Sequence, residues 1–285
     1  MTSVLLAAAL AFTPADAQLA RETAAGLVAR HTPRDAGTQQ GREAASYLYD
    51  AINATGLDAA YDSFVAQTED GPRTMTNIES EYRSDPDAPW IVLVSHYDTK
   101  PGANCPGAND GASTSGLLVA IGDRLYTQRP TGVNVLLLWT DGEECRRAYG
   151  ESDGFWGSRH AAEKFKTSGR KILCVLCLDM LGDRDLKIGI PRNGSPGLRR
   201  VVLRVAESIG LKDCVEARQE LMKDDHTAFL EAGFKSVDLI DFAYGSTPGA
   251  NDYWHTPEDT MDKVSEASLL TAGRLVTAVL DGLRK

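Results

Sequence analysis

The sequence lacks long apolar runs and clusters of basic residues. No run among its 285 residues approaches the roughly 20 apolar residues that a membrane-spanning helix needs, so we expect no membrane span. Its 30 Lys and Arg residues are outnumbered by 40 Asp and Glu and form no basic patch, which argues against a nucleic-acid partner. Linkers, internal repeats and low-complexity segments are also missing, so we expect one domain.

Cysteines are few, and their number is odd. Five cysteines allow at most two disulfides and one free thiol. Cys105 precedes one acidic motif and Cys145 directly follows another, so a Cys105–Cys145 disulfide is a hypothesis to test. Cys174 and Cys177 lie in an apolar run without a second pair to complete a metal site, and we expect them to be buried strand cysteines.

The first segment is rich in small and apolar residues. Residues 1–17 end in Ala15-Asp16-Ala17, which fits the small-x-small rule for signal-peptide cleavage. We therefore expect a signal peptide over 1–17 and a single catalytic domain over 18–285 that is secreted or periplasmic. The alternative is an N-terminal helix packed on the domain, because this segment lacks the basic residues usual at the start of a leader.

Helical and strand periodicities alternate along the rest of the chain. Two helices are expected within 18–56, and the others cover 111–125, 157–166, 198–209, 226–231 and 265–283. The expected strands cover 61–66, 74–82, 90–95, 133–139, 172–178 and 237–240. This alternation predicts a three-layer α/β/α sandwich with a mixed, mostly parallel central sheet.

Acidic residues and histidines follow the apolar runs in a fixed order. They are His96-Tyr97-Asp98, Asn109-Asp110-Gly111, Asp141-Gly142-Glu143-Glu144, Asp179, Asp224-Asp225-His226 and Trp254-His255-Thr256. Open α/β sheets bind their ligands at the carboxyl ends of the strands, so these side chains are expected to converge there. Carboxylates and imidazoles are zinc ligands, and a neighbouring carboxylate that does not bind the metal can move protons. The set therefore predicts a zinc site.

Each motif taken alone has a plainer explanation. Asp110 could be a helix N-cap, the Glu143-Glu144 pair an exposed acidic loop, and Trp254 a core aromatic residue. Asp98 is close enough in sequence to His96 to accept a hydrogen bond from its ring. The order of all the motifs, each at an element boundary, favours the metal site.

From about Trp90 to Val264, six separated motifs match those of a known family in order. The chain resembles zinc exopeptidase family 28, which contains secreted aminopeptidases and the glutaminyl-peptide cyclotransferases, or glutaminyl cyclases. The resemblance implies that the zinc ligands are Asp110, Glu144 and His255, with Glu143 as the general acid/base. Asp179 would be a ligand of the second zinc ion in the two-zinc aminopeptidases, and a catalytic hydrogen-bonding group in the one-zinc cyclases. His96 would bind the second zinc ion where one exists.

Three features resemble the cyclase branch. They are the spacing between Glu144 and Trp156-Gly157-Ser158-Arg159-His160, the sequence Asp224-Asp225-His226, and Trp254 before His255. Four features differ from the animal cyclases. Lys223 occupies the position of a Gln, Tyr149 that of a pocket Trp, and residues 245–252 replace a Phe-Pro segment. The cysteines of the animal cyclases' disulfide are absent, because Ser95 and Thr114 occupy their positions. Substrate preference could therefore differ even where the chemistry is shared.

The first functional hypothesis is a one-zinc cyclase that converts N-terminal glutamine of peptides or proteins to pyroglutamate and releases ammonia. Glu143, Asp179 and Asp224 would be catalytic, and Trp254 and Tyr149 would line the substrate pocket. The alternative is an aminopeptidase that binds two zinc ions, and a second alternative is a non-catalytic binding module on this fold. The sequence does not set the oligomeric state.

Overall fold

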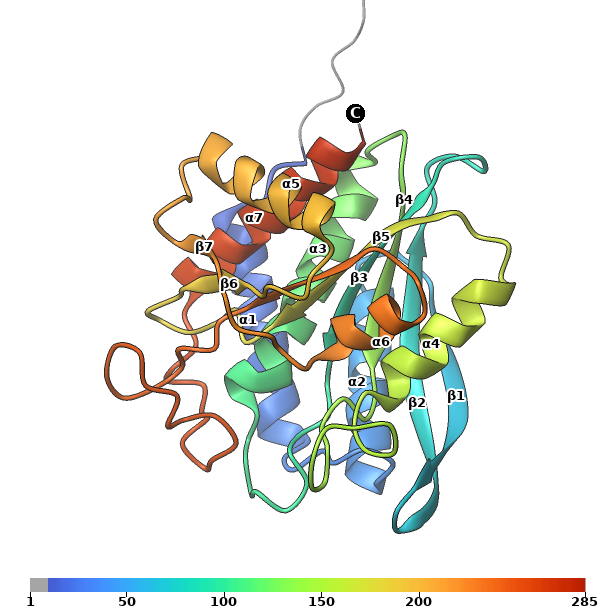
Figure 1. Ribbon diagram of the computed structural model, residues 1–285, viewed down its shortest axis with the longest axis vertical. Coiled ribbons are helices and arrows are strands. Elements are labelled where there is room, and N and C mark those ends of the chain that lie inside the picture. The colour runs from blue at the N-terminus through green and yellow to red at the C-terminus, as the bar shows by residue number, and fades with distance from the viewer. Residues whose placement is uncertain (1–9, 285) are drawn as a thin grey trace, which may run out of the picture.

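The computed structural model describes residues 10–284 and places them in one mixed sheet covered by helices (Figure 1). The strands are β1 (Ala59–Thr68), β2 (Gly71–Tyr82), β3 (Trp90–His96), β4 (Asn134–Thr140), β5 (Ile172–Asp179), β6 (Ile188–Ile190), β7 (Val215–Ala217) and β8 (Ser236–Ile240). The helices are α1 (Pro14–Arg30), α2 (Gln39–Asn53), α3 (Thr114–Gln128), α4 (Trp156–Thr167), α5 (Pro196–Ser208), α6 (Asp225–Glu231) and α7 (Glu266–Leu283), with a π-type turn η1 (Ala108–Ser113) before α3. No helix within these residues is long and apolar enough to cross a membrane.

The sheet runs in the order β1-β2-β4-β3-β5-β8-β6-β7. Its centre is parallel, because β3 pairs in parallel with β4 and β5, and β5 pairs in parallel with β8. The β1–β2 hairpin adds antiparallel strands at one edge, and the short β6 is antiparallel to β8 at the other. The central strands β3 and β4 are buried along their whole length and mostly apolar, because helices cover both of their faces.

Successive residues of the central strands supply two separate cores. Leu93, Leu137 and Leu176 pack with residues of α1, α2, α3, α5 and α7 on one face. Val92 and Leu136 pack with residues of α4 and α6 on the other face (Figure 1). Side chains alternate between the faces of a strand, so each core takes every second residue. The predicted α/β/α sandwich with a mixed sheet is confirmed.

The differences from the predicted elements are local. β6 and β7 were not predicted, because three residues are too few to display an alternating pattern. The predicted helix 111–125 begins regularly only at Thr114, because the backbone of Asp110 (φ −82°, ψ 95°) and Gly111 (φ 90°) is not helical. Asp110 therefore lies in the irregular turn before α3 and is not an N-cap.

Helix α1 begins inside the predicted signal peptide. Residues 1–9 lie outside the described part of the chain, but Leu10 and Phe12 are buried against α7, and the Phe12 ring lies where Gly273 leaves room. The Asp16 carboxylate accepts a hydrogen bond of 2.7 Å from Arg124 Nε on α3. Cleavage after Ala17 would remove all of these contacts. The signal peptide stays a prediction, which N-terminal sequencing of exported protein would test.

Truncation measures how much this segment stabilises the fold. We expect a chain that starts at Gln18 to lose about 3 kcal/mol or more of unfolding free energy, because two large apolar side chains lose their burial at about 1.5–3 kcal/mol each. Denaturant unfolding of the two forms gives the difference directly. The control is a chain that lacks only residues 1–9. Equal stability of the Gln18 form and this control would contradict the expectation.

The predicted Cys105–Cys145 disulfide is wrong. All five cysteines lie in the described part of the chain, and all are free thiols. Cys105 approaches the Asp259 carboxylate at 3.8 Å, whereas Cys145 lies 3.0 Å from Lys100 Nζ. Cys174 and Cys177 are buried in β5 as expected, on opposite faces of the sheet because they lie three positions apart along the strand.

Candidate metal centre

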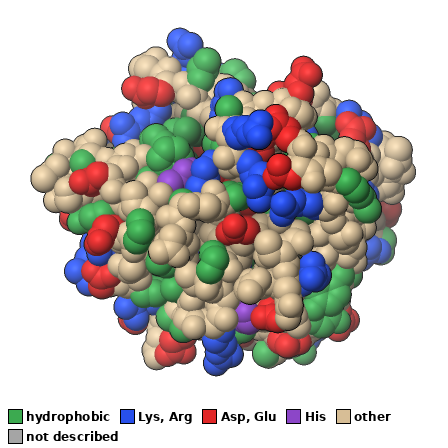
Figure 2. Space-filling model, turned by 90° about the horizontal axis from the view of Figure 1, so that it is seen from below, with side chains coloured by type: hydrophobic (Ala, Val, Ile, Leu, Met, Phe, Trp, Pro, Cys, Tyr) green, Lys and Arg blue, Asp and Glu red, His purple; other side chains and the backbone are tan. Residues whose placement is uncertain are grey.

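The predicted site residues meet at one edge of the sheet. β3 ends at His96 and β5 at Asp179, while Glu143 and Glu144 follow β4 closely. These strands are parallel neighbours, so their carboxyl ends lie side by side at the lower edge in Figure 1. Viewed from below, the corresponding face carries acidic, basic and apolar side chains, and several basic side chains gather near its centre beside acidic ones (Figure 2).

Asp110, Glu144 and His255 form the first cluster. His255 Nε2 lies 2.8 Å from Glu144 Oε1 and 3.3 Å from Asp110 Oδ2. Each of the three residues offers one candidate ligand atom, and these three atoms lie within 4.8 Å of one another. Two carboxylates and one imidazole are a donor set that zinc takes in catalytic sites, where a fourth position stays open.

His96, Asp110 and Asp179 form a second cluster that shares Asp110 with the first. His96 Nε2 lies 3.0 Å from Asp110 Oδ1 and 3.2 Å from Asp179 Oδ1. The two oxygens of Asp110 thus face different histidines. A carboxylate placed in this way has the geometry to bridge two cations.

The chemistry of these residues fits a bound cation. Asp110 Oδ2 is buried without a hydrogen-bond partner among the described residues. Burial and, after it, the Asp110 charge raise the pKa of Glu144 to about 7. For Asp110, burial opposes ionisation, but the neighbouring His255 and His96 rings outweigh burial and lower its pKa. Buried like charges are costly without a compensating cation, and a metal can replace the protons that the histidines now place between the carboxylates.

The turn that presents Asp110 depends on Gly111, which belongs to the predicted motif, and on Asp259, which the sequence analysis missed. Gly111 lies against His96, and a Cβ atom there would come within 2.9 Å of the ring. Asp259, four residues after His255, accepts hydrogen bonds from the backbone N–H groups of Asn109 (2.7 Å) and Asp110 (3.2 Å). Its carboxylate therefore fixes the turn that presents Asp110.

Asp98 has a different partner from the one expected. Its nearest approach to the His96 ring is 3.6 Å, which is longer than a hydrogen bond. Its two carboxylate oxygens instead accept the backbone N–H groups of Glu143 and Glu144, each at 3.1 Å. Asp98 thus positions the loop after β4.

Arg34 is a second residue that the sequence analysis missed. It is fully buried between α1 and α2. Its guanidinium donates to the carbonyls of Tyr97, Pro106 and Gly107 at 2.5, 2.7 and 2.6 Å, and so ties together both ends of the loop between β3 and η1. Burial lowers the pKa of Arg34, and the nearby Asp259 charge opposes that shift.

Glu143 lies beside the first cluster without being one of its candidate ligands. Burial raises the pKa of Glu143 well above its usual range, and the adjacent Glu144 carboxylate raises it further. Tyr149 donates its hydroxyl toward Glu143 Oε2 at 3.2 Å and Glu144 Oε2 at 3.1 Å. Glu143 is thus a buried carboxyl group with one oxygen held by the tyrosine.

Asp224, His226 and Asp238 form a third cluster, which is fully buried. Asp224 caps α6 by accepting the backbone N–H of Asp225. Burial raises the pKa of Asp224 well above its usual range, and the Asp179 charge raises it further. His226 Nε2 accepts a hydrogen bond of 2.9 Å from Asn193 Nδ2, so the ring is neutral.

His226 predicts a specific pH dependence of stability. Burial lowers its pKa to about 4 from 6.5, so protonation favours the unfolded chain. The stabilisation present above pH 6.5 should therefore fall by about 3 kcal/mol as pH drops toward 4. Urea unfolding of wild type and His226→Gln at several pH values checks this. The glutamine side chain can still accept the hydrogen bond from Asn193 but does not titrate. A stability difference between the two proteins that stays constant with pH would contradict the assignment.

A small pocket of about 160 Å³ opens onto the first cluster. Its floor holds Asp110, Glu143 and Glu144, and its walls include Tyr149, Trp254 and Phe242, with Asp179, Lys223, Asp224 and His255 also lining it. The Trp254 indole stacks on the His255 ring at 3.8 Å and meets Phe242 edge-on at 5.0 Å. The structure thus brings all nine sequence-predicted site residues together, eight of them around this pocket and His96 beneath it.

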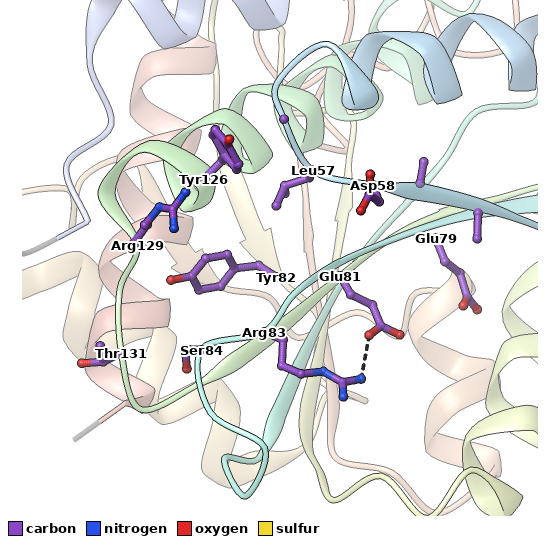
Figure 3. Close-up of a pocket in the computed structure, with 13 residues that line it drawn as sticks. Leu57, Asp58, Glu79, Glu81, Tyr82, Arg83, Ser84, Tyr126, Arg129 and Thr131 are labelled. Carbon is purple, nitrogen blue, oxygen red and sulfur yellow. Dashed lines mark hydrogen bonds and ion pairs between the residues drawn. The ribbon is translucent and has the colours of Figure 1, made fainter.

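A larger cavity of about 720 Å³ lies at the opposite edge of the sheet, where β3 and β4 begin. Tyr126 and Arg129 line it from the end of α3, and Glu81 and Arg83 from the end of β2, where the latter two form an ion pair of 3.0 Å (Figure 3). None of the three acidic and histidine clusters found among residues 10–284 borders this cavity. Volume alone therefore does not identify the site.

Comparison with known proteins agrees with this geometry. The model of "Peptidase family M28" matches residues 77–280. The chain is 26% identical over 207 residues to the glutaminyl-peptide cyclotransferase of Drosophila melanogaster, an alignment that spans 63% of this chain and 57% of the fly protein. It is 25% identical over 191 residues to a probable leucine aminopeptidase of Arthroderma otae, covering 65% and 52% of the two chains.

Among solved structures, an Acidobacteriales bacterium glutaminyl cyclase superposes with a TM-score of 0.89. It is 32% identical to this chain, and the match covers 99% of this chain and 98% of the other. The family match covers most of the sheet, both candidate metal clusters and the pocket. On this basis the chain belongs to peptidase family M28.

Proposed function

We propose that this chain is a zinc-dependent glutaminyl-peptide cyclotransferase that converts N-terminal glutamine to pyroglutamate and releases ammonia. The observation that carries the proposal is the pocket of about 160 Å³, which joins the first metal cluster, the free Glu143 and aromatic walls. Ligand pockets for drug-sized molecules are typically about 300–1,000 Å³, so this one suits a single side chain. The similarity to an Acidobacteriales glutaminyl cyclase over nearly the whole chain supports the same activity.

Asp110, Glu144 and His255 would hold the zinc ion, because their ligand atoms converge beside the pocket. When bound, zinc supplies Lewis acidity that polarises the side-chain amide carbonyl of the substrate. Asp259 and Asp98 keep the ligands in place through the backbone N–H groups of Asp110 and Glu144. Such outer hydrogen bonds orient metal ligands.

Glu143 is the proposed general acid/base. It takes a proton from the α-amine, whose nitrogen attacks the side-chain amide carbon of the same glutamine residue. It then delivers the proton to the amide nitrogen, which leaves as ammonia when its bond to carbon breaks. The new carbon–nitrogen bond closes the pyroglutamate ring, so no water enters the overall reaction.

Asp179 and Asp224 are proposed to orient the leaving amide. Both line the pocket, and their charges interact, as the raised pKa of Asp224, due to burial and then to Asp179, indicates. A carboxylate there can accept hydrogen bonds from the substrate amide nitrogen. Trp254 and Tyr149 would confine the side chain so that the amine and amide meet.

A two-zinc aminopeptidase is the second candidate, favoured by one observation. The His96, Asp110 and Asp179 cluster keeps a full set of donors for another cation. In that reaction Glu143 would activate water instead of the substrate amine. Peptide N-termini would be the substrates in both cases, and export from the cytoplasm remains a prediction.

Zinc stoichiometry separates the two candidates. We expect about one zinc per chain after dialysis against metal-free buffer, and about two if the chain is an aminopeptidase. Elemental analysis of wild type and His96→Asn gives both numbers. For a one-zinc protein, this substitution should leave the zinc content unchanged. A fall from two to one in His96→Asn would contradict the cyclase assignment.

A further inference from the structure

Tyr149 stands where its hydroxyl reaches both carboxylates that follow β4. The oxygen lies 3.2 Å from Glu143 Oε2 and 3.1 Å from Glu144 Oε2. The other oxygen of Glu144 faces His255 at 2.8 Å. Tyr149 therefore contacts one oxygen of each carboxylate, and neither of these oxygens is the one that faces His255.

The tyrosine ring is fixed from several sides. It stacks on Phe155 with ring centroids 4.7 Å apart and nearly parallel planes. Lys100 Nζ lies 5.5 Å from the ring centroid and also 3.7 Å from Glu144 Oε2. The backbone carbonyl of Tyr149 accepts a hydrogen bond of 3.0 Å from Lys223 Nζ. The hydroxyl is therefore held in place by contacts that do not involve the carboxylates.

The loop that carries Tyr149 is also anchored at its base. The Asp153 carboxylate accepts the backbone N–H groups of Arg146 and Arg147, both at 2.8 Å. The side chains of the same arginines pair with the turn of the β1–β2 hairpin, Arg146 with Asp70 at 2.9 Å and Arg147 with Glu69 at 2.7 Å. These ion pairs are exposed and individually weak, whereas the Asp153 carboxylate is buried and shielded from solvent.

We propose that Tyr149 is a positioning residue for the general acid/base. Two adjacent buried carboxylates repel each other, and a hydroxyl donor between them offsets part of that cost. The donated hydrogen bond holds Glu143 beside the metal cluster and out of it, with its remaining oxygen free to exchange a proton with the substrate. A displacement of a catalytic group by about 1 Å is enough to slow a reaction by about 10²-fold.

The pocket-wall role and the positioning role can be separated, because they use different parts of Tyr149. The ring forms the wall and the stack on Phe155, whereas the hydroxyl alone reaches the carboxylates. Phenylalanine keeps the ring and removes only the hydroxyl. The inference rests on the proposed function only through Glu143, which moves the proton in the cyclase and the aminopeptidase alike.

The test compares Tyr149→Phe with wild type and with Tyr126→Phe, a matched control in the distant cavity. We expect kcat of Tyr149→Phe to fall by about tenfold or more, with KM changed by less than about threefold. Zinc content and the inhibition constant of imidazole, which binds zinc directly, should stay at the wild-type values. Tyr126→Phe should match wild type in all four quantities.

A kcat within twofold of wild type would overturn the proposal, and so would a loss confined to KM or to zinc content. Tyr149→Leu, which removes ring and hydroxyl together, should lower kcat and raise KM. If wild type releases no ammonia but cleaves peptides, the proposed function fails while the same comparison on the cleavage reaction still tests Tyr149. Thermal unfolding of each variant shows whether it is folded.

Discussion

Glu143→Gln is expected to lower kcat for ammonia release by about 10²- to 10⁴-fold while zinc remains bound, because general acid/base catalysis contributes this much. Glutamine has the shape of glutamate but does not take up the amine proton. The variant should be at least as stable as wild type, because a neutral side chain no longer repels Glu144. Steady-state ammonia release, zinc analysis and denaturant unfolding check the three statements.

Two comparisons make this prediction specific to Glu143. Glu163→Gln on the exposed side of α4 removes the same charge far from the pocket and should leave kcat unchanged. Glu144→Gln removes a proposed ligand and should lose zinc together with activity. Retention of more than a tenth of wild-type kcat in Glu143→Gln would remove Glu143 from the proposed role.

Arg34→Met is expected to reduce the free energy of unfolding by about 3–5 kcal/mol, the cost of breaking a buried charged network. Methionine has similar length and no donor, so the carbonyls of Tyr97, Pro106 and Gly107 would each lose a hydrogen-bond partner. An unsatisfied buried polar group costs about 1–3 kcal/mol. Since the same loop leads to Asp110, we also expect weaker zinc binding.

Urea unfolding and a zinc titration measure the two effects. Arg42→Met, on the exposed side of the neighbouring helix α2, is the matched control and should change stability by less than about 0.5 kcal/mol. Arg34→Lys keeps the positive charge but lacks the planar guanidinium, so its stability should lie between those of Arg34→Met and Arg42→Met. A stability of Arg34→Met within 1 kcal/mol of wild type would show that the carbonyl network is not stabilising.

The sequence predicted the central sheet and the convergence of the motif residues at one of its edges. Continuous apolar runs identify β3, β4 and β5, because strands covered on both faces have no polar side to interrupt them. Parallel strands bring their carboxyl ends together, so His96, Glu144 and Asp179 could be placed at one edge without a structure. The polar residues at those ends carried the rest of the prediction.

Supporting interactions could not be predicted because they join segments far apart in the chain. Arg34 contacts a loop more than 60 residues away, and Asp259 binds a turn about 150 residues away. Neither residue lies in a periodic pattern or a strand end. The Tyr149 hydroxyl bonds likewise depend on how its loop folds back, so the sequence identified the residue as a wall but not as a donor.

The N-terminal segment illustrates a conflict between two sequence patterns. Small and apolar residues before Ala17 fit both a cleavage site and the start of a packed helix, and composition alone does not separate them. The structure places Pro14 at the first turn of α1, a position where its missing N–H costs nothing. The contact of Asp16 with Arg124 extends over more than 100 residues, which a sequence pattern does not reveal.

The most direct test of the account follows two products from one Gln-initiated dipeptide. Purified zinc-loaded protein is incubated with the peptide, and ammonia and free amino acids are measured in the same samples. We predict that ammonia and pyroglutamyl peptide form in a one-to-one ratio and that no free amino acid appears. In Glu143→Gln, neither ammonia nor pyroglutamyl peptide should form. Free glutamine without ammonia would contradict the account and identify the chain as an aminopeptidase.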